Sequence, residues 1–136
     1  MERQTKIVDA SIILKWFLNE EDSDKALILK EKYMQKEILL IIPDLLFIEV
    51  ANVLKYKKQN LEKINMANEY LWDLQLNIKG INKDFLYKAI EISLKYNLTV
   101  YDSIYIALAQ SYDCELITAD EELAKCPNVK LLNEIE

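Results

Sequence analysis

Residues 6–18 read KIVDASIILKWFL: a short β-branched run breaks off at Asp9, and an apolar stretch with helical spacing follows at once. This pattern predicts a strand at Lys6–Asp9 and a short helix at Ser11–Leu18, with Ser11 as its N-cap. A strand that leads directly into a helix is the repeating unit of α/β proteins with a parallel sheet. The aspartate at the junction lies among residues expected to be buried, so its charge needs a compensating partner.

The rest of the chain repeats this alternation of short apolar runs and helical periods. Further strands are predicted at Ile38–Ile42, Asn77–Ile81, Glu115–Thr118 and Val129–Leu132. Helices are predicted at Asp22–Lys36, Leu45–Lys58 (capped by Asp44), Ile64–Leu76, Lys83–Tyr96, Asp102–Tyr112 and Asp120–Cys126. The order of these elements predicts an α/β fold with a central, mainly parallel, five-stranded sheet.

The composition is that of a compact globular chain. The 136 residues are 51% hydrophobic with one glycine and two prolines, which predicts a single domain over residues 1–136 without a linker. The longest uninterrupted apolar run, Ile38–Ile42, is far short of the roughly 20 residues that span a bilayer. Cys114 and Cys126 form no CxxC pair, which favours two reduced thiols. We expect a soluble, cytoplasmic protein without a membrane partner.

Charge and missing residue types exclude several classes of protein. The net charge of −6 argues against a general nucleic-acid coat, but not against an enzyme that meets a phosphodiester through a bound cation. A single glycine excludes P-loop and dinucleotide-binding motifs, and the absence of histidine excludes hydrolases with a histidine base. A phosphoacceptor receiver domain is disfavoured because the predicted third strand, NIKGI, ends without an acid.

Four acidic residues lie where the apolar segments break off or change direction: Asp9, Glu49, Asp102 and Asp120. Each of the three aspartates, taken alone, could be a helix N-cap or a first-turn residue. Glu49 is different, because it lies in the middle of an otherwise apolar helix. Its structural alternative is a buried ion pair, for which the sequence offers no obvious partner.

The predicted topology brings these acids toward one place. Asp9 ends the first strand and Asp120 lies just past the fourth, so both project into one crevice if these strands are neighbours where the strand order reverses. Asp102 and Glu49 could reach the same end of the sheet. Four hard oxygen ligands without imidazole or paired thiolates suit Mg²⁺ or Mn²⁺. Such ions orient a water molecule and neutralise developing charge at phosphorus.

The strings VDASIILKWF, PDLLFIEVANVL, LTVYDSIYIALA and LITADEEL resemble, in this order, the four acidic motifs of the PIN domain family. The resemblance covers nearly the whole chain, from Lys6 to Leu132, and the VDAS…KWF opening most resembles the VapC-type toxins of toxin–antitoxin pairs. It implies a three-layer α/β/α, Rossmann-like fold and a Mg²⁺- or Mn²⁺-dependent endoribonuclease. An RNA substrate and an antitoxin protein are the implied partners.

The resemblance also implies a set of site residues. The family's acids correspond here to Asp9, Glu49, Asp102 and Asp120. Ser11 and Thr118 match small hydroxyl positions that support the site in many relatives, and Asp113, Glu121 and Glu122 are nearby substitutes for Asp120. We hypothesise that the three aspartates hold the metal, that Glu49 binds it directly or through water, and that metal-activated water attacks the phosphodiester.

Two alternatives remain open at this point. The chain could be a PIN-domain nuclease that acts in RNA processing rather than as a toxin. It could also be a catalytically inactive, PIN-like binding module, although the intact Asp9, Glu49 and Asp102 argue against loss of the site.

Other features have both a functional and a structural interpretation. The segment Lys55–Lys63, KYKKQNLEK, could follow an RNA backbone, but a solvated helix end is favoured. The apolar surfaces of Leu45–Leu54 and Ile104–Leu108 exceed what one helix face can bury, which indicates a homodimer interface or a groove for an antitoxin helix. Core or dimer packing is favoured over base stacking for Trp16, Trp72, Tyr101, Tyr105 and Tyr112.

Overall fold

The computed structural model describes residues 3–135, and its centre is a five-stranded sheet in which all neighbouring strands are parallel. The strand order is β3-β2-β1-β4-β5. The strands are β1 Gln4–Val8, β2 Ile38–Pro43, β3 Asn77–Lys79, β4 Glu115–Thr118 and β5 Val129–Leu131. The predicted five-stranded sheet is confirmed, and it is entirely rather than mainly parallel.

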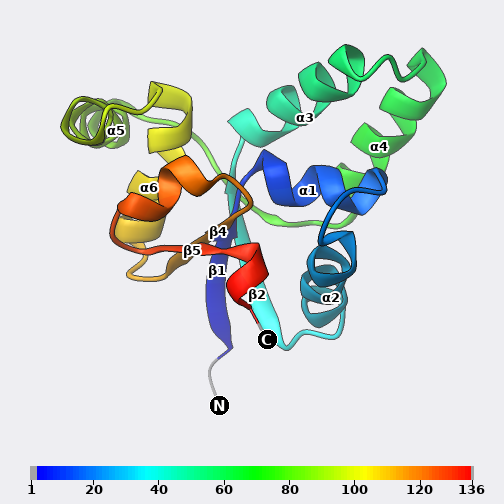
Figure 1. Ribbon diagram of the computed structural model, residues 1–136, viewed down its shortest axis with the longest axis horizontal. Coiled ribbons are helices and arrows are strands. Elements are labelled where there is room, and N and C mark those ends of the chain that lie inside the picture. Colours follow the sequence, from blue (N-terminus) through cyan, green and yellow to red (C-terminus); the bar gives the residue numbers. More distant parts are fainter. Residues whose placement is uncertain (1–2, 136) are drawn as a thin grey trace.

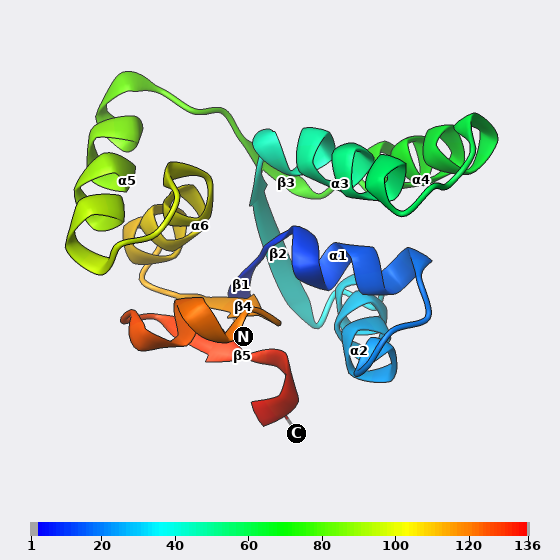
Figure 2. The same cartoon turned by 45° about the horizontal axis from the view of Figure 1, so that its top comes forward.

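Helices cover both faces of this sheet. Figure 1 shows α5 and α6 on one side, and α1 and α2 on the other. Figure 2 shows α3 and α4 running beside each other and projecting past the sheet. The helices are α1 Ala10–Phe17, α2 Ser23–Met34, α3 Leu45–Tyr56, α4 Leu61–Asp73, α5 Lys83–Tyr96 and α6 Val100–Ser111, with short 3₁₀ helices η1 Glu121–Lys125 and η2 Leu132–Glu134. The expected three-layer α/β/α architecture is confirmed.

Burial of both sheet faces explains why the strands read as continuous apolar runs rather than as alternating patterns. In β2, Ile38, Leu40, Ile41 and Ile42 are all buried. Helix α6 packs against the sheet on one side and against α5 on the other, and every residue of Ile104–Leu108 is buried. The interpretation of Ile104–Leu108 as excess surface for a partner is therefore wrong, because this chain itself covers both sides of the helix.

The aspartate after β1 caps α1 with its side chain. Asp9 Oδ1 accepts a hydrogen bond from the backbone N–H of Ser11 at 3.1 Å, and Ser11 itself lies in the first turn. The prediction of Ser11 as the N-cap is therefore wrong, and β1 ends at Val8 instead of Asp9. Both residue types can accept this bond, so the sequence alone did not distinguish them.

Capping residues also shift the start of other helices. Helix α6 begins at Val100 with Thr99 as its N-cap, so the predicted start at Asp102 is wrong. Helix α4 begins at Leu61 rather than Ile64, because Asn60 accepts a hydrogen bond from the N–H of Lys63. Asp44 precedes α3 but its side chain makes no capping hydrogen bond.

The remaining differences are at the ends of the predicted elements. Helix α3 ends at Tyr56 instead of Lys58, and α4 ends at Asp73 instead of Leu76. The segment predicted as a short helix at Asp120–Cys126 is the 3₁₀ helix η1, which Asp120 caps. Smaller shifts of one or two residues affect the start of β1, both ends of α1 and α2, and the C-terminal ends of β2, β3, α6 and β5.

The strand order reverses between β1 and β4. From β1, the chain builds outward through β2 and β3 on one side, and through β4 and β5 on the other. Val8 pairs with Ile117, so Asp9 and Thr118 follow directly at adjacent carboxyl ends. The prediction that the first and fourth strands are neighbours is confirmed, and ligands of open α/β sheets bind at this position.

Neither cysteine is engaged in a disulfide. Cys114 and Cys126 are free, and burial raises the pKa of both thiols, which favours the unreactive protonated form. Within residues 3–135, no helix has the length and apolar character required to cross a membrane.

Candidate active site

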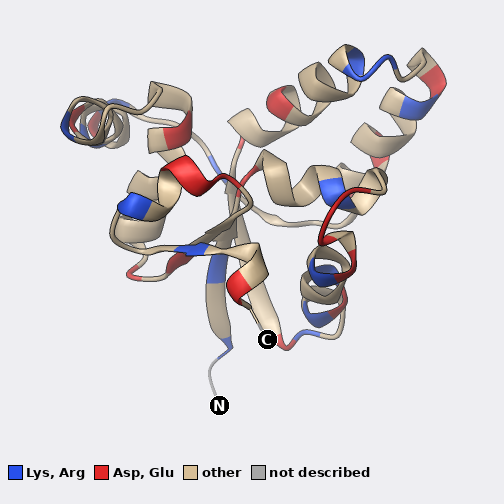
Figure 3. Ribbon diagram, in the orientation of Figure 1, with Lys and Arg blue, Asp and Glu red and all other residues tan. Residues whose placement is uncertain are grey.

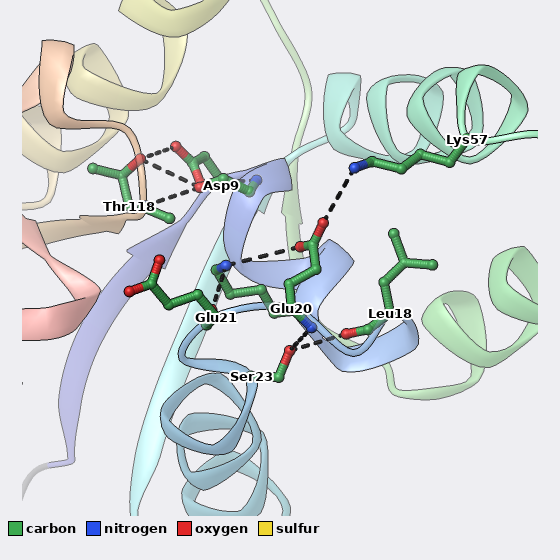
Figure 4. A network of polar contacts seen from close by, with 10 residues as sticks. Asp9, Leu18, Glu20, Glu21, Ser23, Lys57 and Thr118 are labelled. Atoms are coloured by element: carbon green, nitrogen blue, oxygen red, sulfur yellow. Dashed lines mark hydrogen bonds and ion pairs between the residues drawn. The ribbon is translucent and has the colours of Figure 1, made fainter.

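Asp9 is held at the carboxyl edge of the sheet by two hydroxyl groups. Its Oδ1 accepts a hydrogen bond from Ser11 Oγ, and its Oδ2 accepts one from Thr118 Oγ1, each at 2.5 Å. Figure 4 shows Thr118 facing the Asp9 carboxylate from the neighbouring strand. The same hydroxyl oxygens also accept backbone N–H groups beyond β4, Ser11 Oγ from Ala119 at 2.9 Å and Thr118 Oγ1 from Asp120 at 3.1 Å. These bonds tie the turn after β4 to the start of α1.

Burial makes the charge on this carboxylate costly. Asp9 is 6% exposed, and burial raises the pKa of its carboxyl from 3.8 to about 6. The hydrogen bonds from Ser11 and Thr118 lower the pKa, while the negative charge of Asp102 raises it. Asp9 therefore lies in a place where a nearby positive charge would stabilise the ionised form.

Glu49 of α3 and Asp102 of α6 are two further acidic residues at the carboxyl edge of the sheet. Both are partly buried, and burial raises the pKa of each. The charge of Asp102 raises the pKa of Glu49, and the charge of Asp120 raises the pKa of Asp102. Tyr105 donates a hydrogen bond from its hydroxyl to Glu49 Oε1 at 2.5 Å. Asp102 is thus electrostatically coupled to Asp9, Glu49 and Asp120.

Asp120 combines two roles that the sequence presented as alternatives. It is exposed, and its Oδ1 accepts the N–H of Glu122 at 3.0 Å as the cap of η1. Its charge also raises the pKa of Asp102, so it lies within electrostatic range of that residue. Helix capping and proximity to the site are therefore compatible here.

The proposed substitutes for Asp120 lie elsewhere or are engaged otherwise. Asp113 precedes β4 and so lies at the amino end of that strand, whereas Asp9 and Asp120 follow the carboxyl ends of their strands. Glu122 is exposed and lies 3.9 Å from Lys125. Asp120 is thus the acid of this group whose charge acts on Asp102.

The four acids lack basic partners. In the part of the chain that the structure describes, no Lys or Arg nitrogen lies within 4.0 Å of Asp9, Glu49, Asp102 or Asp120. The recorded ion pairs lie elsewhere, such as Lys57 with Glu20 at 3.4 Å, which is drawn in Figure 4. Figure 3 shows acidic segments of α3, α6 and η1 around the carboxyl edge of the sheet. The edge therefore carries uncompensated negative charge.

Comparison with protein families identifies the chain. The family model of the PIN domain matches residues 6–128. The chain belongs to the PIN domain family. This PIN domain is 35% identical over 125 residues to Ribonuclease VapC3 of Pyrobaculum aerophilum, a match that covers 88% of this chain and 92% of that protein. The resemblance inferred from the four acidic motifs is confirmed.

Solved structures share the fold of this PIN domain. A toxin–antitoxin complex from Klebsiella pneumoniae matches with a TM-score of 0.69 and 24% identity, covering 96% of this chain and 99% of that one. The Mycobacterium tuberculosis toxin VapC20, described as cleaving the sarcin-ricin loop, matches with a TM-score of 0.73 and 12% identity over 91% and 96% of the two chains. At these identities the likeness concerns the fold.

The donor set of this PIN domain fits a hard divalent cation. All four groups are carboxylates, and burial of three of them makes a nearby cation favourable. With the side chains in their observed positions, residues 3–135 contain no three Asp, Glu, His or Cys groups that are close enough together to hold a metal ion. Mg²⁺ commonly binds proteins through one or two carboxylates and keeps water in its other positions, so the donor chemistry and this spacing are compatible.

The hydrogen bond between Tyr105 and Glu49 was not predicted from the sequence. The ring of Tyr105 is 1% exposed, which agrees with the predicted packing role, but its hydroxyl binds Glu49. The available signal was spacing, since Tyr105 follows Asp102 by three positions and shares a helix face with it. Trp16 is also buried, whereas Tyr101 and Trp72 are 60% and 51% exposed, so packing within the chain covers them only in part.

Proposed function

We propose that this PIN domain is a metal-dependent endoribonuclease and the toxin of a toxin–antitoxin pair. The observation that carries the proposal is the group of four electrostatically coupled acids at the strand-order reversal, without a basic partner within 4.0 Å in the described chain. Similarity to a relative named as a ribonuclease supports RNA as the substrate. The site residues and the metal belong to this proposal.

Each residue has a defined task in it. Asp9, Asp102 and Asp120 would hold Mg²⁺ or Mn²⁺, one or two of them directly and the rest through water bound to the ion, and Glu49 would bind directly or through water. Ser11 and Thr118 orient the Asp9 carboxylate, because Oδ1 accepts the N–H and the hydroxyl of Ser11 and Oδ2 accepts the hydroxyl of Thr118. When bound, the cation lowers the pKa of an attacking water and neutralises charge that develops at phosphorus. The chain lacks histidine, so no imidazole competes for the role of general base.

The proposed partners are RNA, an antitoxin protein and a second copy of the chain, acting in the cytoplasm. The solved toxin–antitoxin complex with this fold supports an antitoxin. Large apolar side chains on the surface support association, among them Ile48 at 70%, Leu94 at 81% and Tyr101 at 60% exposure. A PIN nuclease of RNA processing, or an inactive binding module, remains the alternative that experiments must exclude.

RNA cleavage by the purified protein with Mn²⁺ tests the catalytic proposal. We expect EDTA to abolish cleavage, and Asp9→Asn and Asp102→Asn each to lower the rate by about 100-fold or more, because each removes a charge from the metal site. Asp113→Asn is the matched control, since Asp113 lies at the opposite end of β4. Undiminished cleavage in both site variants would rule out this site.

A growth experiment separates a toxin from an RNA-processing nuclease. Induced expression of the wild type should arrest growth, and Asp9→Asn should not. Co-expression of an antitoxin encoded by an adjacent small reading frame should restore growth. Harmless expression of an enzyme that is active in vitro would favour the processing nuclease instead.

A further inference from the structure

Helix α6 carries a buried hydroxyl whose recorded partner belongs to the candidate site. Tyr105 lies among Ile104, Ile106 and Ala107, all of which are buried. A phenylalanine would supply the same apolar ring to this core, so packing alone does not require the hydroxyl. Burying a hydroxyl costs free energy unless it is hydrogen-bonded, and here its partner is Glu49 Oε1.

Within residues 3–135, the Glu49 carboxylate accepts no recorded hydrogen bond from its own helix. Asp9 receives hydroxyl groups from Ser11 and Thr118, but Glu49 lies on α3, which projects with α4 past the sheet. Among the described residues, the bond from Tyr105 is the one side-chain hydrogen bond recorded between α3 and α6. Glutamate also has more rotatable bonds than aspartate, so its carboxylate needs an external contact to keep one orientation.

We infer that Tyr105 is a positioning residue that holds Glu49 Oε1 by its hydroxyl and leaves Oε2 as the oxygen directed to the metal or its water. This inference rests on the proposed function, because it assigns Glu49 a role in the site. No other recorded hydrogen bond within residues 3–135 reaches the Glu49 carboxylate. Glu49 therefore acts through one oxygen, and the rigid, buried tyrosine ring sets its place relative to Asp102.

The hydroxyl can be removed without removing the ring. In Tyr105→Phe we expect kcat for RNA cleavage to fall by about 10- to 100-fold, as for loss of other groups that orient a metal ligand, while KM for RNA stays unchanged. Affinity for Mn²⁺, measured by titration calorimetry on the folded protein, should fall in parallel. The matched control is Tyr33→Phe, which removes a hydroxyl that donates to the carbonyls of Leu74 and Gln75.

A double-mutant cycle distinguishes positioning from a general structural effect. If Tyr105 acts only through Glu49, the variant Tyr105→Phe/Glu49→Gln should be no slower than Glu49→Gln alone. If the hydroxyl merely stabilises the fold, the two losses should multiply, and Tyr33→Phe should show a comparable loss.

The outcomes separate this inference from the proposed function. Wild-type kcat and Mn²⁺ affinity in Tyr105→Phe, together with an impaired Glu49→Gln, would overturn the role of Tyr105 and leave the ribonuclease proposal standing. Multiplying losses in the double variant would also overturn it. Full activity in Glu49→Gln would overturn the role of Tyr105 and that of Glu49, but would leave the ribonuclease proposal to the Asp9 and Asp102 variants. No Mn²⁺ binding by the wild type would overturn both proposals.

Discussion

Asp9 shows how one side chain can serve the fold and the site at the same time. As the N-cap of α1, it accepts a hydrogen bond from a backbone N–H. As a buried carboxylate, it is costly to ionise, because burial raises its pKa. The same position would be an ordinary cap if it were exposed. Its burial between β1 and β4 is therefore what makes a bound cation favourable.

The stability of the metal-free protein should depend on this residue and on pH. The pKa of Asp9 is about 6 in the folded protein against 3.8 ordinarily, so folding favours the protonated form. The contribution is complete below about pH 4 and is lost as pH rises through about 6. Asp9→Asn should therefore be more stable than the wild type above pH 6, by on the order of 1–3 kcal/mol.

Urea unfolding in EDTA between pH 4 and pH 8 measures this difference. The advantage of the asparagine variant should shrink toward pH 4, where the wild-type carboxyl is protonated. Asparagine is itself a good N-cap, so loss of the cap does not confuse the comparison. An advantage that does not change with pH would contradict the role assigned to the Asp9 charge.

At the level of elements, the types and order of helices and strands were predictable, and several of their starts were not. Hydrophobic periodicity identified α5 at Lys83–Tyr96 and β4 at Glu115–Thr118 with the observed bounds. The starts of α4 and α6 shifted because Asn60 and Thr99 bind backbone N–H groups three positions later. Such local bonds compete with other cap candidates, and periodicity does not rank them.

The cap of α4 gives a prediction at this scale. Replacing Asn60 by alanine removes the acceptor of the Lys63 N–H and should lower the free energy of unfolding by about 1 kcal/mol. Asn60→Asp retains an acceptor and serves as the control. Thermal unfolding and hydrogen exchange of α4 amides measure the effect. Equal stability of the two variants would show that the observed bond does not stabilise the helix.

For the molecule as a whole, metal binding should be visible as stabilisation. A ligand that binds only the folded state at 100 times its Kd stabilises by about 3 kcal/mol. We expect Mn²⁺ to raise the melting temperature of the wild type and of Asp113→Asn. The rise should be lost in Asp102→Asn, because Asp102 is coupled to the other three acids.

Scanning calorimetry with and without Mn²⁺ makes this comparison and requires no RNA substrate. The three proteins should have similar melting behaviour in EDTA apart from the small effects of each substitution. An equal Mn²⁺ response in all three would place the ion away from the carboxyl edge of the sheet.

The sequence by itself determined the α/β alternation, the four acids and the absence of histidine, because these depend on local spacing and composition. The tertiary structure decided which groups meet. Thr118 reaches Asp9 across 109 positions of the chain, and Tyr105 reaches Glu49 across 56. Contacts between such distant residues follow from strand order and helix packing, which local periodicity does not specify. That is why Asp9 could be selected from its motif, while the contact of Tyr105 with Glu49 required the fold.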